Sequence, residues 1–179
     1  MSAGSLARRY AKALMQLGEE QNNYEKLGSE LSVLAGAMTA SDELRDTLTN
    51  PLFQRSDRQN VIEAVLARIG ASPTIKNFSL LLLDRERLAA VPAISRELDG
   101  MIDDKIGRVN AEVWSATKLN PGQEAQIRTE LEKLSGKTVD MTSSHDPSLL
   151  GGVVARVGDV VYDGSLKTQL QHIKAQLSK

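Results

Sequence analysis

Cysteine is absent from the 179-residue sequence, and aromatic residues make up only 3% of it. Without cysteine the chain forms no disulfide, uses no thiolate nucleophile and holds no cysteine-ligated metal. The scarcity of aromatic side chains indicates a core of Leu, Val, Ile and Ala, and it leaves few surfaces on which nucleic-acid bases could stack. Charges nearly cancel, with 22 Lys and Arg against 23 Asp and Glu. Because nucleic-acid binding needs a basic footprint, we expect no nucleic-acid partner.

Long hydrophobic runs are also missing. A membrane-spanning helix needs about 20 apolar residues, whereas the apolar run Leu80–Leu83 is bounded by Ser79 and Asp84. The N-terminal segment lacks the apolar core of a signal peptide, and its Arg8–Arg9 pair falls within an amphipathic pattern. We therefore expect a soluble intracellular protein that associates with a membrane only through other proteins.

Six helices are predicted in the first part of the chain, where apolar residues recur every three or four positions. The expected segments are Leu6–Asn22, Tyr24–Ala40, a short helix from Ser41–Asp42 to before Asn50–Pro51, a helix that ends at Gly70, a helix that begins at Ser72–Pro73, and a helix that carries Val91–Ile106. Ser56 and Gln59 have the spacing of a capping box for the fourth helix. In the fifth helix, apolar residues around Leu81 occupy nearly every side of the helix, which indicates that the helix is buried on several sides. Short links between the helices are typical of an all-α bundle.

The pattern changes near residue 106. Val109, Ala111 and Val113 alternate with Asn110, Glu112 and Trp114, and this period of two predicts a strand. Asn120–Pro121 then predicts the start of a helix that Gly136 ends. A short strand is expected at Val139–Met141.

A hairpin and a last helix are predicted to complete the chain. Gly158–Asp159 separates two β-branched runs, as in a tight hairpin turn. Ser165 is expected to cap a final helix with a seam of Leu166, Leu170, Ile173 and Leu177. The predicted fold class is an N-terminal all-α six-helix bundle, residues 1–105, followed by a smaller α+β domain with a short sheet and a C-terminal helix, residues 106–179.

Three stretches of the sequence carry a family resemblance. Residues 146–166 contain Asp-Pro-Ser-Leu-Leu-Gly-Gly-Val-Val, then Arg-Val-Gly-Asp, then Asp-Gly-Ser-Leu. Residues 7–14 read Ala-Arg-Arg-Tyr-Ala-Lys-Ala-Leu, and Asn77 is followed by Leu81–Leu82, Arg87–Leu88 and Pro92. With these motifs the chain resembles the delta subunit of F-type ATP synthases, the bacterial relative of the mitochondrial oligomycin-sensitivity-conferring subunit. It departs from the family pattern at His145 and Ala155, where aliphatic or larger branched residues are usual, and at Arg85, where Asn is common.

The resemblance implies a non-catalytic stator subunit of the proton-translocating ATP synthase, which couples rotation to ATP synthesis. It implies that residues 1–105 bind the alpha/beta catalytic head and that residues 106–179 bind the C-terminal helices of the peripheral-stalk b subunits. The expected contacts with the N-terminal helix of an alpha subunit, lying between the first and fifth helices, are Tyr10, Ala13, Leu14, Asn77 and Leu81. The expected b-subunit contacts are Leu170 and Ile173, and the expected structural turn residues are Gly151, Gly152, Gly158 and Gly164. The implied location is the cytoplasmic face of the bacterial inner membrane, where the protein is peripheral and part of the complex.

The sequence shows no catalytic or metal-binding constellation. Its two histidines are expected in a loop (His145) and on a polar helix face (His172). Gly151–Gly152 is not followed by the Lys-Ser/Thr of a phosphate-binding loop, so it predicts a turn. We expect no enzyme activity, cofactor or metal. Two alternatives stay open: an unrelated helical-bundle adaptor in another assembly, and a small-molecule enzyme that uses the carboxylates near Asp84–Asp104.

Overall fold

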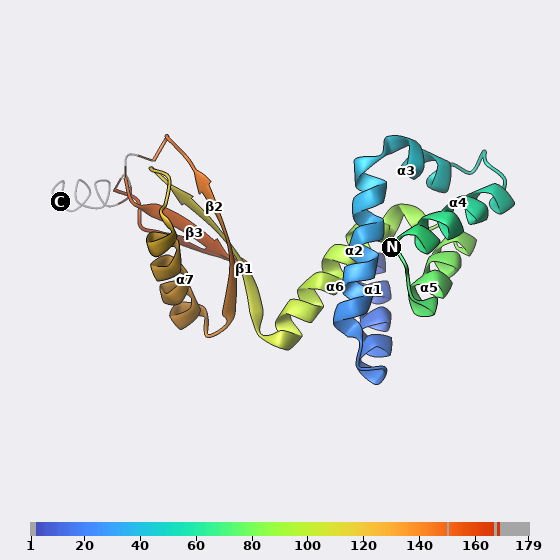
Figure 1. The fold of residues 1–179 in the computed structure, drawn as a ribbon, viewed down its shortest axis with the longest axis horizontal. Helices are drawn as coiled ribbons and strands as arrows, with labels where there is room; N and C mark the ends of the chain where they lie inside the picture. Colours follow the sequence, from blue (N-terminus) through green and yellow to red (C-terminus); the bar gives the residue numbers. More distant parts are fainter. Residues whose placement is uncertain (1–2, 150, 167, 169–179) are drawn as a thin grey trace. The chain divides into compact units, whose positions relative to one another are not determined.

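The computed structural model describes residues 3–149, 151–166 and 168 (Figure 1). The chain divides into two compact units, residues 1–102 and 103–179. Helices build the first unit, and the described part of the second unit is a sheet with a helix on it. Among the described residues, no helix combines the length and the apolar character that crossing a membrane requires.

The helical unit is made of α1 (Ala3–Glu20), α2 (Tyr24–Ala40), α3 (Asp42–Thr49), α4 (Arg55–Arg68), α5 (Pro73–Asp84), a short 3₁₀ helix η1 (Leu88–Ala90) and α6 (Val91–Ile106), whose last residues lie in the second unit. Each helix contributes its apolar stripe to one core, in which Leu14, Leu31, Ile62, Leu82 and Ile94 are at most 1% exposed. Burying one such side chain contributes about 1.5–3 kcal/mol. The core is thus aliphatic, as the composition predicts.

Most helix ends follow the predicted capping residues. The Ser41 hydroxyl accepts a hydrogen bond from the Leu44 N–H and caps α3, and the Ser72 hydroxyl accepts one from the Ile75 N–H and caps α5. Gly70 has φ +68° just after α4, as predicted for a helix stop. α1 ends two residues before the predicted Asn22, because Asn22 itself takes a positive φ of 51°.

The predicted capping box of α4 is wrong. α4 begins at Arg55 with Gln54 as its N-cap, so Ser56 lies inside the first turn. The Gln59 side chain cannot turn back to the backbone, because it accepts a hydrogen bond from Arg55 and donates one to Glu63. Side-chain contacts along the helix therefore replace the capping interaction.

The second unit contains β1 (Arg108–Ser115), α7 (Pro121–Ser135), β2 (Thr138–His145), β3 (Val153–Val157) and β4 (Val160–Asp163). The sheet order is β2-β1-β3-β4, with β1 and β2 parallel and the other neighbours antiparallel. Helix α7 connects the parallel pair and lies on one face of the sheet (Figure 1). Its Leu131 packs with Ala111, Val113, Ala155 and Val157 in a small core.

Local predictions for this unit are largely confirmed. Asn120 and Gln123 form the capping box of α7, and Gly136 ends it with φ +67°. Gly158 has φ +57° in the hairpin turn, and the Ser165 hydroxyl accepts a hydrogen bond from the Thr168 N–H as a helix cap does. Two details are wrong: the short strand at Val139–Met141 extends to His145, and His145 therefore ends a strand and does not lie in a loop.

The predicted fold class is confirmed, with a helical unit followed by a smaller α+β unit. Of the segment predicted to form the last helix, only the first residues are described. Leu170, Ile173, Leu177 and His172 lie outside the described residues.

Candidate functional site

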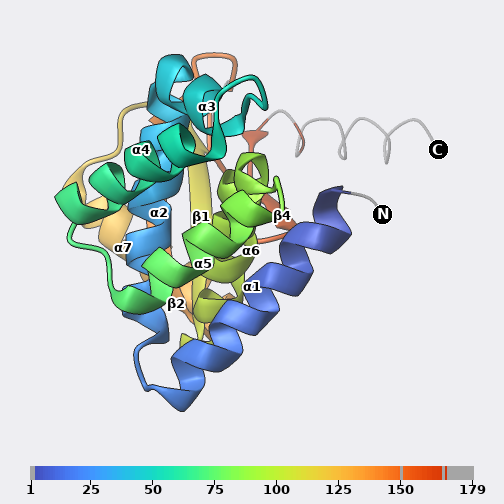
Figure 2. The ribbon, with the colours of Figure 1, turned by 90° about the vertical axis from the view of Figure 1, so that its right-hand side faces the viewer.

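Helices α1 and α5 contact each other through aromatic and polar side chains. The ring of Tyr10 meets the ring of Phe78 edge-on, with the ring centres 6.1 Å apart. The Arg87 guanidinium lies over the Tyr10 ring and donates a hydrogen bond of 2.6 Å to its hydroxyl. Just after the end of α1, the Gln21 side chain lies 3.4 Å from the Thr74 hydroxyl of α5. The Tyr10–Phe78 contact joins the two helices directly, and the other two contacts involve residues just beyond their ends. Figure 2 shows the two helices next to each other in the helical unit.

Apolar side chains are exposed beside this contact. Leu17 of α1 is 43% exposed and Leu81 of α5 is 44% exposed. Ala13 and Asn77 are also exposed, and Tyr10 is half-buried. At about 100° per residue, positions 10, 13 and 17 share one side of α1, and positions 77 and 81 share one side of α5. We call this surface, formed by Tyr10, Ala13, Leu17, Asn77 and Leu81, the α1–α5 face.

Two predicted residues have a different environment from the one expected. Leu14 is 1% exposed, so its side chain supports the face from the core and does not lie on the surface. The sequence predicts that α5 is buried on several sides. Phe78 and Leu82 are buried, but Leu81 is open to solvent, so one side of α5 is exposed. Leu17 is not among the contacts predicted from the sequence, although its position seven residues after Tyr10 places it on the same side of α1.

The predicted glycines of the second unit lie where backbone segments approach closely. Gly152 has φ +83°, and a Cβ added there would overlap the Gly164 carbonyl oxygen. A Cβ at Gly151 would lie 2.6 Å from Leu166 Cδ1. The Gly151 carbonyl accepts a hydrogen bond of 3.0 Å from the Leu166 N–H, and the Gly164 N–H donates one of 2.9 Å to Val153. The glycine pair thus packs against residues 164–166, just after β4.

The sheet face opposite α7 carries an aromatic and charged cluster. The Arg156 guanidinium lies over the Trp114 ring, 5.9 Å from its centre, and donates a hydrogen bond of 2.7 Å to Glu112. All three residues point away from the small core because they alternate with Ala111, Val113 and Ala155, Val157 along the strands. Arg156 therefore both shields the indole face and neutralises Glu112.

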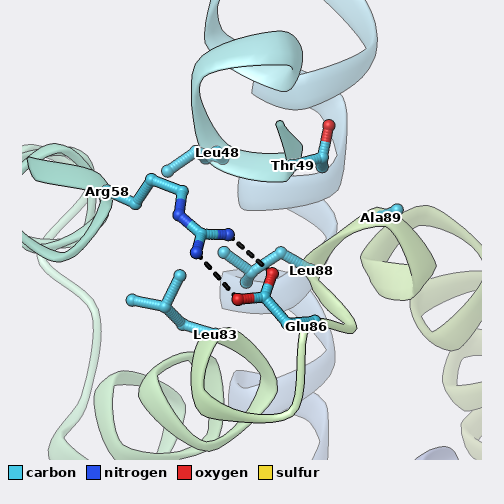
Figure 3. A pocket seen from close by; sticks show the side chains of 7 residues that line it. All are labelled: Leu48, Thr49, Arg58, Leu83, Glu86, Leu88 and Ala89. Atoms are coloured by element: carbon cyan, nitrogen blue, oxygen red, sulfur yellow. Dashed lines mark hydrogen bonds and ion pairs between the residues drawn. The ribbon is translucent and has the colours of Figure 1, made fainter. Parts of the chain in front are cut away.

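The carboxylates considered for an enzyme are each engaged by a basic side chain. The pairs are Asp84 with Arg55, Glu86 with Arg58, Asp103 with Arg108, and Asp104 with Lys137. The cavity beside Glu86 has a volume of about 20 Å³ (Figure 3), which accommodates about one water molecule. Within the described ranges, no cluster of histidine and carboxylate side chains could hold a metal ion. This arrangement offers no room for a substrate at Glu86.

Comparisons with known proteins point to one family. The model of the family described as ATP synthase delta (OSCP) subunit matches residues 6–177. The ATP synthase subunit delta of Geotalea uraniireducens is 38% identical over all of this chain and 99% of its own length. The protein of the same name from Anaeromyxobacter dehalogenans is 39% identical over the full length of both chains, and that of Desulfotalea psychrophila is 37% identical over 96% of this chain and 95% of its own.

A solved structure shares the fold. A chain of the cryo-EM structure of the Toxoplasma gondii mitochondrial ATP synthase hexamer has a TM-score of 0.70 with this chain. The match covers 97% of this chain and 98% of that chain at 21% identity. At this level of identity the likeness concerns the fold.

Proposed function

The chain belongs to the ATP synthase delta (OSCP) subunit family, and from that membership we propose that the α1–α5 face is the surface with which it binds the catalytic head. It is a non-catalytic stator subunit of the ATP synthase and a peripheral component of that membrane complex. A stator must hold the head against the torque of the rotor, which requires a firm protein–protein joint and no chemistry of its own. The unrelated adaptor and the small-molecule enzyme are not favoured by the family match.

The exposed pair Leu17 and Leu81 is the observation that supports this proposal. The two side chains lie on two helices that are already tied together by Tyr10 and Phe78, so their spacing is set before any partner binds. Exposed apolar side chains held on two packed helices suit the apolar face of an amphipathic helix, which docks through residues one turn apart. The small side chain of Ala13 lets such a helix approach closely, and Asn77 supplies a polar group at the rim.

The proposed occupant is the N-terminal helix of an alpha subunit. A joint that resists torque needs nanomolar affinity, which corresponds to about −12 kcal/mol. A few buried anchors dominate such interfaces, and aromatic side chains are enriched among them. We therefore assign the anchoring role to Tyr10, Leu17 and Leu81, with Leu14 holding α1 in place from beneath.

The second unit is proposed to bind the C-terminal helices of the b subunits. This places the two attachments on two separately folded units, residues 1–102 and 103–179, so that head and stalk are held by different cores. The b-subunit contacts proposed at Leu170 and Ile173 follow from the family resemblance alone. We further propose that the complex holds this chain at the cytoplasmic face of a bacterial inner membrane.

Calorimetric titration of the full chain with a synthetic peptide of the alpha-subunit N-terminal segment tests the head contact. We expect nanomolar to low-micromolar binding, and a loss of about tenfold or more in Leu17→Glu and Leu81→Glu, because each substitution buries a charge against an apolar helix. Val33→Glu is the matched control, since Val33 is 51% exposed on α2. Equal losses in all three variants, or no binding by the unmodified folded chain, would reject the α1–α5 face as the head site.

A further inference from the structure

Glu86 occupies a backbone conformation that usually belongs to glycine. It follows α5 with φ +54°, in the left-handed region where a side chain crowds the backbone. The turn is closed by two hydrogen bonds, from the Glu86 N–H to the Leu83 carbonyl (3.0 Å) and from the Arg87 N–H to the Leu82 carbonyl (2.8 Å). Something other than intrinsic preference must therefore stabilise Glu86 in this turn.

Arg58 of α4 supplies that stabilisation. Its two terminal nitrogens donate hydrogen bonds of 2.6 and 2.7 Å to the two carboxylate oxygens of Glu86 (Figure 3). Arg58 is only 4% exposed and its Nε has no hydrogen-bond partner in the described structure. A buried guanidinium needs a carboxylate partner, so the pair fixes the direction in which the Glu86 side chain leaves the backbone.

The residue after Glu86 reaches the α1–α5 face. Arg87 donates to the Tyr10 hydroxyl and lies over the Tyr10 ring, with 5.7 Å between its guanidinium carbon and the ring centre. Because the direction of the Arg87 side chain depends on the backbone turn at Glu86, a change in that turn moves the group that holds Tyr10.

We propose that Arg58 is a positioning residue for the α1–α5 face: it holds Glu86 in the left-handed turn and thereby sets Arg87 against Tyr10. Arg58 itself does not belong to the face, whose members lie on α1 and α5. Its effect on partner binding rests on the proposed function, whereas its effect on Tyr10 does not.

A neighbouring ion pair separates this proposal from simple bracing of α4 against α5. Arg55 of α4 also pairs with a carboxylate at the end of α5, that of Asp84. Asp84 is the last residue of the helix and has no left-handed backbone to stabilise. If bracing alone mattered, loss of the Arg55–Asp84 pair would affect Tyr10 as loss of the Arg58–Glu86 pair does.

The direct test observes Tyr10 by ¹⁹F NMR in the full chain labelled with 3-fluorotyrosine. The Tyr10 resonance is assigned by its loss in Tyr10→Phe. We expect Arg58→Met and Glu86→Gln to shift this resonance and Asp84→Asn to leave it in place. We also expect the double variant Arg58→Met with Glu86→Gly to return it toward the original position, because glycine adopts the turn without help. An unchanged resonance in both single variants, or no recovery in a folded double variant, would overturn the proposal.

Peptide binding supplies the second readout. The alpha-subunit peptide should bind Arg58→Met and Glu86→Gln more weakly by about fivefold or more, with recovery in the double variant and no loss in Asp84→Asn. Circular dichroism identifies the folded variants, and Glu86→Gln decides the outcome if Arg58→Met does not fold. If the unmodified chain binds no peptide, the head-binding proposal fails while the fluorine result still decides the role of Arg58. Binding losses of equal size in Asp84→Asn would reduce Arg58 to a bracing residue and overturn the proposal.

Discussion

Glu30 of α2 accepts two hydrogen bonds from Ser72, one from its backbone N–H at 2.8 Å and one from its hydroxyl at 2.6 Å. The same Ser72 oxygen caps α5 by accepting the Ile75 N–H. The Glu30 side chain is 11% exposed, so this carboxylate is largely removed from water; one of its oxygens accepts both Ser72 hydrogen bonds, and the other lies 3.9 Å from the Lys26 ammonium. Helix α5, which carries Asn77 and Leu81 of the α1–α5 face, is thus anchored to α2 at its first turn.

Removal of the Glu30 carboxylate should destabilise the helical unit. We expect Glu30→Ala to lower the free energy of unfolding by about 1–3 kcal/mol, because two donors of Ser72 lose their acceptor. Glu30→Gln keeps an acceptor and should cost less. Ser32→Ala, an exposed change on the same helix, should stay within about 0.5 kcal/mol. Urea unfolding followed by far-ultraviolet circular dichroism measures these values, and equal stability of Glu30→Ala and Ser32→Ala would contradict the anchoring role.

Gly152→Ala should destabilise the second unit more than Gly136→Ala does. Both glycines have positive φ, +83° and +67°, so alanine costs about 1–2 kcal/mol of backbone strain at either position. At Gly136 the new methyl group meets open space, whereas at Gly152 it overlaps the Gly164 carbonyl and the following backbone, which cannot move aside as a side chain could. Thermal unfolding of the two variants gives the comparison. Similar melting temperatures would show that the Gly152–Gly164 approach relaxes without cost.

Capping residues could be predicted from the sequence because their partners lie within three or four positions. The side chains of Ser41, Ser72 and Asn120 each accept the backbone N–H three residues on, and proline follows two of them. Gly136 ends α7 through its own conformational freedom. These features depend on local geometry, and the structure reproduces them at α3, α5 and α7. The capping box predicted for α4 fails although it is local, because Gln59 pairs with Arg55 and Glu63.

Several features that the sequence does not predict depend on partners far away in the chain. β2 extends to His145 because the parallel strand β1 supplies hydrogen-bond partners along its whole length, from Arg108 to Ser115. The Arg58–Glu86 pair joins residues 28 positions apart, and the Arg87–Tyr10 hydrogen bond joins residues 77 apart. Spacing along one helix gives no sign of such pairs. The sequence therefore predicts which helices carry the candidate face but not what holds that face together.

Acid should weaken the helical unit through Glu86. Hydrogen bonds from Arg58 hold the pKa of the Glu86 carboxyl below its usual value of 4.5. A lowered folded-state pKa gives stability that is fully present above the usual value and is lost as the pH falls through the folded-state pKa. We expect the difference in unfolding free energy between the unmodified chain and Glu86→Gln to shrink as the pH falls below 4.5. Chemical unfolding at a series of pH values tests this, and a difference that grows toward acid would contradict the lowered pKa.

The fluorescence of Trp114 should report the Arg156 contact, since it is the chain's single tryptophan. Arg156→Ala removes the guanidinium 5.9 Å from the ring centre and exposes the indole face to water, so we expect a red shift of the emission maximum. The loss of the cation–π contact at this half-exposed site should cost about 0.5–1 kcal/mol of unfolding free energy. Arg128→Ala, which removes an exposed arginine from α7, serves as the charge-matched control and should leave the emission unchanged. A spectrum that stays the same in Arg156→Ala would mean that the guanidinium does not cover the indole ring in solution.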